Sequence, residues 1–122
     1  MKNKKTILLV DDETNMINML GNLIERKGKK ALIAYTGGEA IDLYKKNKPH
    51  CVFLDIMLPD LHGVEVLKKI QEIDFGAKVY FMSGIVDNTI YSTKEKIKEL
   101  GIIDYISKPI DLTKLMAIIE TL

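Results

Sequence analysis

Polar side chains stand at the carboxyl ends of four apolar runs that are spread over the chain. If these runs are parallel strands, their carboxyl ends share one edge of a sheet, which is where open α/β sheets bind ligands. Like charges a few ångströms apart cannot all stay ionised unaided, so carboxylates gathered there need a cation. The pattern therefore predicts a divalent-metal site beside a phosphoryl acceptor. The polar residues are Asp11 and Asp12 after 6–10, Asp55 after 51–54, Ser83 after 79–82 and Lys108 after 105–107.

Each of these residue types has a use in phosphoryl chemistry. A carboxylate such as Asp55 is a poor nucleophile toward an anionic phosphoryl group, and a bridging Mg²⁺ lowers that repulsion. Mg²⁺ prefers oxygen ligands and keeps several waters, so two or three carboxylates and one carbonyl suit it. Lys108 would offset the charge on the transferring oxygens, and Ser83 would donate a hydrogen bond to one of them.

Five units of strand followed by helix account for the whole chain, with strands expected at 6–10, 31–35, 51–54, 79–82 and 105–107. Such alternation predicts one α/β domain with right-handed crossovers and a doubly wound parallel sheet. Helix starts are indicated by capping boxes at Thr36 with Glu39 and at Ser92 with Glu95, and by Gly63 and Asp111. Gly101 is expected to end the fourth helix in a left-handed conformation.

Composition narrows the class of protein. The 122 residues fit a single domain over 1–122, and a formal net charge of +1 argues against direct nucleic-acid or membrane partners. No apolar run reaches the length of a membrane span and no signal-peptide core follows the polar start, so a cytoplasmic location is expected. Cys51, the single cysteine, is expected in the core, while His50 and His62 are expected to face solvent.

Four motifs carry a family resemblance: Val-Asp-Asp-Glu at 10–13, Leu-Asp-Ile-Met-Leu-Pro-Asp at 54–60 with Gly63 behind it, Met-Ser-Gly at 82–84 and Tyr-Ile-Ser-Lys-Pro-Ile at 105–110. Together they resemble the receiver domain of two-component response regulators, in order and over the entire chain. The resemblance implies a flavodoxin-like (βα)5 fold with strand order 2-1-3-4-5.

Roles for individual residues follow from the resemblance. It implies a domain that takes a phosphoryl group from a histidine kinase and catalyses only its own phosphotransfer and dephosphorylation. The matching positions are Asp55 as phosphoacceptor, Asp11, Asp12, Asp55 and the backbone carbonyl of Met57 as ligands of Mg²⁺ or Mn²⁺, Lys108 as phosphate-pairing cation, and Ser83 with Tyr105 as the switch pair.

Partners are implied in the same way. A sensor histidine kinase or phosphotransfer protein would donate the phosphoryl group, and a downstream protein or output domain would contact the fourth helix, fifth strand and fifth helix. Phosphorylation-dependent homodimerisation is left open. The family also typically has a cis peptide bond before the proline that stands here as Pro109.

Departures from the family pattern concern detail. Ser83 replaces the commoner threonine, and the segment 85–91 is expected to form an extended loop. Met57 and Ile85 are apolar where the family's residues influence attack by water on the phosphoryl group, so a long-lived phosphorylated state is expected.

Two other functions and one structural role fit the residues less well than this interpretation. A dehalogenase-type phosphatase needs a second Asp two residues after its nucleophile, where Met57 stands. A flavodoxin-like nucleotide binder would need a loop rich in glycine and hydroxyl groups after the first strand, and the acids at 11–13 would repel phosphate. Asp12 alone could simply cap the first helix, but capping does not call for a second adjacent acid.

Overall fold

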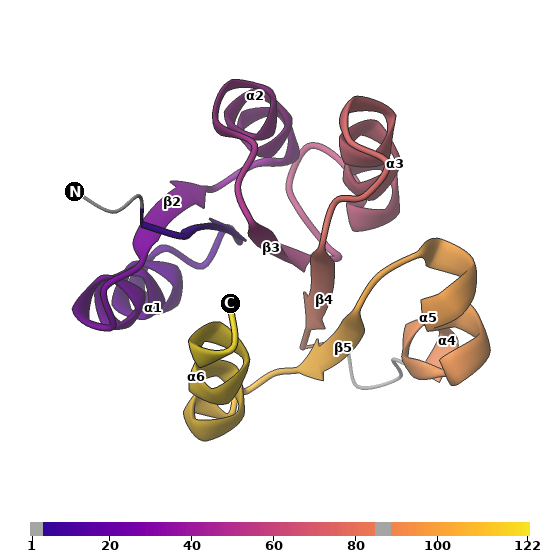
Figure 1. Cartoon of the computed structure of the whole chain (residues 1–122). Coiled ribbons are helices and arrows are strands. Elements are labelled where there is room, and N and C mark those ends of the chain that lie inside the picture. Colours follow the sequence, from indigo (N-terminus) through magenta and orange to yellow (C-terminus); the bar gives the residue numbers. More distant parts are fainter. Residues whose placement is uncertain (1–3, 85–88) are drawn as a thin grey trace.

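A five-stranded parallel sheet forms the centre of the protein, with strand order β2-β1-β3-β4-β5 (Figure 1). The computed structural model describes residues 4–84 and 89–122. This order confirms the predicted doubly wound sheet. The strands are β1 (Thr6–Val10), β2 (Lys30–Ala34), β3 (Cys51–Asp55), β4 (Val79–Ser83) and β5 (Asp104–Ser107), and the helices are α1 (Thr14–Arg26), α2 (Gly37–Asn47), α3 (Gly63–Ile73), α4 (Thr89–Ser92), α5 (Lys94–Leu100) and α6 (Leu112–Glu120).

Helices cover both faces of the sheet. Figure 1 shows α1 and α6 on one side and α2, α3, α4 and α5 on the other. Because side chains alternate along a strand, neighbouring strand residues enter different cores. Leu8 and Leu54 pack toward α2 and α3, whereas Ile7 and Phe53 pack toward α1 and α6. All five residues of β3 are buried, as expected for a strand covered on both faces.

The helix starts agree in part with the predicted caps. Thr36 accepts a hydrogen bond from the Glu39 backbone N–H at 3.1 Å, but the Glu39 carboxylate accepts from the Tyr35 N–H at 2.8 Å instead of closing a box with Thr36. Gly63 opens α3 as predicted, and His62 caps it in a box with Glu65.

One expectation about a helix start is wrong. The predicted cap at Ser92 is not formed: Ser92 ends the short helix α4, and Thr93 caps α5 by accepting from the Lys96 N–H at 3.1 Å. A one-residue offset of this kind arises because adjacent Ser and Thr offer equivalent hydroxyl groups. Asp12 does not cap α1, whose N-cap is Glu13 without a side-chain hydrogen bond.

Other local features follow the sequence closely. Gly101 ends α5 with a φ of 76°, and the Lys108–Pro109 peptide bond is cis. Within residues 4–84 and 89–122, none of the helices has the length and apolar character needed to cross a lipid bilayer.

Candidate functional site

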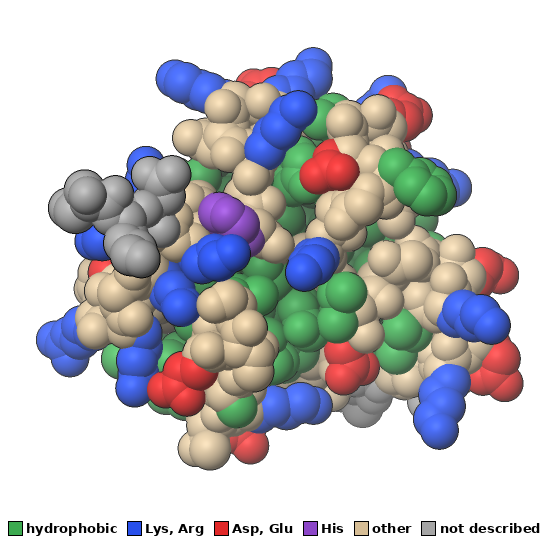
Figure 2. Space-filling model, viewed as in Figure 1, with side chains coloured by type: hydrophobic (Ala, Val, Ile, Leu, Met, Phe, Trp, Pro, Cys, Tyr) green, Lys and Arg blue, Asp and Glu red, His purple; other side chains and the backbone are tan. Residues whose placement is uncertain are grey.

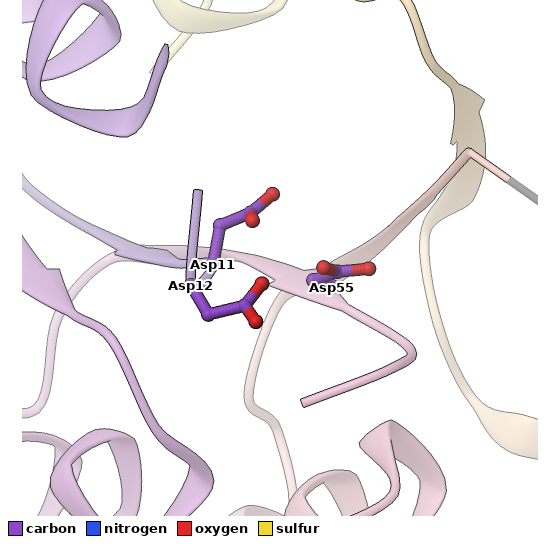
Figure 3. Close-up of side chains that lie close together, drawn as sticks. All are labelled: Asp11, Asp12 and Asp55. Carbon is purple, nitrogen blue, oxygen red and sulfur yellow. The ribbon is translucent and has the colours of Figure 1, made fainter. Parts of the chain in front are cut away.

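Three carboxylates meet where β1 and β3 end (Figure 3). Asp11, Asp12 and Asp55 each offer one carboxylate oxygen, and these oxygens lie within 4.8 Å of one another. Asp11 and Asp55 are buried, whereas Asp12 is exposed. The residues come together because β1 and β3 are parallel neighbours, with Val10 beside Leu54 in the register.

Lys108 reaches this cluster from the loop after β5. Its Nζ lies 2.6 Å from Asp11 Oδ2 and 3.3 Å from Asp55 Oδ2, and its side chain is largely buried. The Lys108 ammonium donates a hydrogen bond to Asp55 Oδ2 and lies closer still to Asp11 Oδ2, with which it forms an ion pair. One ammonium group is therefore shared between two buried carboxylates.

Burial and charge act on both sides of this contact. Burial and the charge of Asp11 raise the pKa of Asp55 to about 6, although Lys108 and the backbone N–H of Met57 oppose the change. For Lys108, burial lowers the pKa, but its contacts with Asp11 and Asp55 outweigh burial and the pKa is raised. The carboxylates of Asp11 and Asp55 are thus held close together, and the single ammonium group of Lys108 does not fully offset their repulsion.

The cluster has the features of a metal site. Carboxylate oxygens are the hard ligands that Mg²⁺ and Ca²⁺ prefer. Asp11 Oδ1 accepts from the Glu13 N–H at 2.9 Å, and Asp11 Oδ2 lies 2.6 Å from the Lys108 ammonium, which Asp11 shares with Asp55. A cation bound among Asp11, Asp12 and Asp55 would offset the negative charge that this single ammonium group leaves.

The predicted switch residues, Ser83 and Tyr105, lie on the neighbouring strands. Ser83 is buried at the end of β4, beside Ser107 of β5 in the register, and its carbonyl accepts from the Lys108 N–H at 2.8 Å. Tyr105 of β5 is 7% exposed and packs in the core that faces α3 and α5. Its hydroxyl oxygen is buried and has no hydrogen-bond partner in the described part of the chain.

The loop between β3 and α3 is held close to Asp55. Met57, which is half exposed, donates its backbone N–H to Asp55 Oδ1 at 3.4 Å and forms an isolated antiparallel bridge with His62. The Gly63 N–H donates to the Ile56 carbonyl at 2.6 Å. A Cβ at Gly63 would lie 2.7 Å from Ile56 Cα, so only glycine permits this approach.

Asp60 is a residue of this loop to which the sequence assigns no role. Its carboxylate accepts from the backbone N–H groups of Gly37 at 2.8 Å and Gly38 at 2.9 Å, at the N-terminus of α2. These two hydrogen bonds lower the pKa of Asp60. A Cβ at Gly37 would lie 2.8 Å from Val66 Cγ2, so this helix start packs too closely for a larger residue. The pair Gly37 and Gly38 is the feature of the sequence that could have indicated such close packing.

His62 is also more than a solvent-facing residue. Its Nδ1 accepts from the Val64 N–H at 3.1 Å, and its Nε2 lies 3.4 Å from the Tyr91 hydroxyl. The expectation that His62 faces solvent is therefore wrong, because its ring caps α3 and contacts α4. His50 is exposed as expected.

Two further predictions can be placed. Cys51 is fully buried, and burial raises the pKa of its thiol to about 12, which agrees with the expected place in the core. Residues 85–88 of the expected loop 85–91, including the apolar Ile85, lie outside the described residues, whereas residues 89–91 belong to the helix α4, so the loop is shorter than expected at this end.

Known proteins resemble this chain over most of its length. Residues 7–120 match the family model described as response regulator receiver domain. The chain is 32% identical over 118 residues to sporulation initiation phosphotransferase F of Bacillus subtilis, covering 94% of this chain and 90% of that protein. It is 34% identical over 115 residues to the chemotaxis protein CheY of Halobacterium salinarum, covering 92% and 91%. It also matches the transcriptional regulatory protein TrcR of Mycobacterium tuberculosis at 33% identity over 91% of this chain, but spans only 42% of that protein.

Solved structures show the same relationship. A CheY-like receiver domain from Methanospirillum hungatei superposes with a TM-score of 0.86 at 28% identity, covering 98% of this chain and 93% of the other. A CheY from Borrelia burgdorferi, solved in a complex with CheX, BeF3 and magnesium, has a TM-score of 0.82 at 27% identity, covering 93% and 84%. The chain therefore belongs to the response regulator receiver domains of two-component systems.

Proposed function

We propose that Asp55 is the phosphoacceptor of this receiver domain and that Asp11, Asp12, Asp55 and the Met57 carbonyl hold Mg²⁺ or Mn²⁺ during the transfer. The observation that carries this proposal is the buried position of Asp55 between Asp11 and Lys108, where its pKa is raised to about 6. A carboxylate in that position is held at high electrostatic cost, and transfer of a phosphoryl group to it changes its charge and its contacts.

The residues have distinct roles in the transfer. A carboxylate oxygen of Asp55 attacks the phosphorus of a phosphohistidine, the new O–P bond forms as the P–N bond breaks, and the departing imidazole nitrogen takes up a proton. The bound metal would supply positive charge shared between the attacking and transferring oxygens. Lys108, already 3.3 Å from Asp55, supplies a second positive charge.

A small phosphodonor tests the acceptor directly. With acetyl phosphate and magnesium, the intact mass of the protein should rise by one phosphoryl group, and Asp55→Asn should abolish the increase. Asp74→Asn is the matched control, because Asp74 is a partly buried carboxylate at the other end of the sheet, and it should be labelled like the wild type. An Asp55→Asn variant that gains an acid-labile phosphoryl group at the wild-type rate would contradict the assignment.

Ser83 and Tyr105 would carry the signal away from the site. A phosphoryl group on Asp55 offers Ser83 a new acceptor, and a shift of β4 toward it changes the packing of Tyr105 on β5. Tyr105 is already turned inward in this structure. Addition of beryllofluoride should change the amide chemical shifts of Tyr105 and of α6. Changes confined to residues next to Asp55 would show that no such switch operates.

This mechanism sets the expected partners. The donor would be a sensor histidine kinase or a phosphotransfer protein, in a cytoplasmic setting. The recipient would be a downstream protein or output domain that contacts α4, α5, β5 and α6, or a second copy of the phosphorylated domain. Apart from its own phosphorylation and dephosphorylation, the domain would catalyse no reaction.

A further inference from the structure

A polar cavity of about 420 Å³ opens at the amino end of the sheet, opposite the Asp55 site. It lies between the residue before β1, the connections α2–β3 and α3–β4, and the end of α6. Figure 2 shows this face, with basic side chains (blue) around a histidine (purple). The ionisable lysine, histidine and aspartate side chains of its lining are Lys5, Lys48, His50, Asp74 and Lys78.

Lysine side chains outnumber acidic side chains in the described lining of the cavity. The ion pairs found within residues 4–84 and 89–122 leave Lys5, Lys48 and Lys78 without a carboxylate within 4.0 Å. Asp74 is the one acidic side chain among the described lining residues. Its Oδ2 already accepts from the Tyr44 hydroxyl at 2.8 Å and its Oδ1 from the Gly76 N–H at 3.0 Å. Three ammonium groups therefore share one cavity whose single acidic side chain, among the described residues, already accepts two hydrogen bonds.

His50 adds a directed hydrogen-bond donor. Its Nδ1 accepts from the Thr6 backbone N–H at 2.9 Å, so the proton of the neutral ring is placed on Nε2. An imidazole held in this tautomer can donate from Nε2 to an anionic oxygen in the cavity. The hydrogen bond to Thr6 also orients the ring, because it joins the α2–β3 connection to the first residue of β1.

Lys48 occupies a backbone position that favours glycine. It ends α2 with a φ of 44°, the left-handed conformation in which residues other than glycine are uncommon. Its N–H closes the helix by donating to the Tyr44 carbonyl at 2.8 Å. A lysine therefore stands at a turn where glycine is favoured, and its side chain lines the cavity.

We propose that this cavity binds a small soluble anion that carries two or more phosphate groups, such as a nucleotide. Phosphate oxygens match the chemistry of the lining, since ammonium groups and an imidazole N–H form charge-assisted hydrogen bonds with them. The volume falls within the range of pockets that hold small organic ligands and exceeds what a single phosphate needs. The ligand would lie at the far end of the sheet from Asp55, so its binding requires neither the metal nor phosphorylation.

A titration with inorganic tripolyphosphate tests the proposal. The amide spectrum of the full chain is followed in EDTA and at constant ionic strength. Saturable shifts are expected at Thr6, His50, Gly76 and Lys78, while Gly84 and other amides near Asp55 stay unchanged. The double variant Lys48→Gln with Lys78→Gln should bind tripolyphosphate at least roughly tenfold more weakly than the wild type. Both lysines are exposed, so the fold should be retained.

The matched control removes the same charge from the same region. Lys45→Gln with Lys46→Gln changes two exposed lysines of α2 that do not line the cavity, and it should bind tripolyphosphate like the wild type. ADP should produce the same set of shifts. Equal weakening in both double variants, shifts without saturation, or shifts confined to the Asp55 end would overturn the proposal. Binding to phosphatidylglycerol vesicles in the absence of saturable tripolyphosphate binding would overturn the assignment to a soluble ligand.

Discussion

The two ends of the sheet use carboxylates in opposite ways. At the carboxyl end, Asp11 and Asp55 are buried beside each other and share one ammonium group, that of Lys108. At the amino end, Asp74 accepts hydrogen bonds from a hydroxyl and a backbone amide, and three lysines line the same cavity. The same side-chain type is electrostatically destabilised in the first place and satisfied in the second. The reactivity proposed for Asp55 therefore rests on burial combined with like charge, not on the presence of a carboxylate.

Tyr44 makes the difference clearer. Burial raises the pKa of its hydroxyl, and the hydrogen bond to Asp74 raises it further, so the group stays protonated and remains a donor. Lys108 at the other end is also a donor, but it must serve two acceptors. The carboxyl end therefore leaves capacity for a cation, whereas the Asp74 carboxylate does not.

Magnesium affinity should separate the two ends most strongly. Asp12→Ala removes an exposed ligand from the cluster and should weaken Mg²⁺ binding by roughly 100-fold, or about 2.7 kcal/mol. Asp74→Asn should leave the affinity unchanged. Because the chain has no tryptophan, calorimetry or amide chemical shifts are suitable measurements. Wild-type affinity in Asp12→Ala would remove the distinction between the two ends.

The pH dependence of stability should show a smaller effect. The pKa of Asp55 rises from 3.8 to about 6 on folding, so the folded state binds this proton more tightly than the unfolded state. The stabilisation that this proton provides is complete below the unfolded pKa and is lost as the pH rises through the folded pKa. Ionised Asp55 should therefore lower the free energy of unfolding by about 1–3 kcal/mol at neutral pH in the absence of metal.

Chemical denaturation of the wild type and Asp55→Asn measures this difference. The variant should be the more stable at neutral pH, and its advantage should shrink between about pH 6 and pH 4. Excess Mg²⁺ should also reduce the advantage, because the cation compensates the Asp55 carboxylate. Parallel stability profiles across this pH range would mean that Asp55 titrates normally.

The smallest effect is expected at the amino end. Tyr44→Phe removes the donor to Asp74 and leaves a partly buried carboxylate with one partner fewer, which should lower the free energy of unfolding by about 1–2 kcal/mol without changing Mg²⁺ affinity. Tyr35→Phe is the matched control, because its hydroxyl donates to a neutral partner, Asn18, at 3.0 Å. It should cost less. An unchanged free energy of unfolding in Tyr44→Phe would show that the Asp74 carboxylate does not need the tyrosine hydroxyl as a partner.

Most of the sheet could be predicted from local pattern. Apolar runs of four or five residues ended at Asp11, Asp55 and Ser83, and parallel pairing brings such ends to one edge whatever the loops do. Lys108 was placed at the same edge for the same reason. Its division between two carboxylates could not be predicted, because it depends on the path of the loop after β5.

Contacts between loops were beyond the sequence pattern. Asp60 reaches Gly37 and Gly38 across 22–23 residues, and no periodicity links a loop carboxylate to a particular helix terminus. The sequence predicts a solvent-facing His62 because an isolated histidine has no local partner, yet Tyr91 of a separate helix lies beside it. The cap at Ser92 was one residue out because Thr93 offers the same hydroxyl chemistry.

By itself the sequence determined the order of strands and helices, the residues at the carboxyl edge and the family to which their motifs belong. These properties depend on side-chain periodicity and on residues adjacent in the chain, which are visible without coordinates. Only the tertiary structure decided which charges are buried together, which are satisfied and which share a cavity. The physical reason is that desolvation and Coulomb interactions depend on distance and burial, and these are set by packing between segments far apart in the chain.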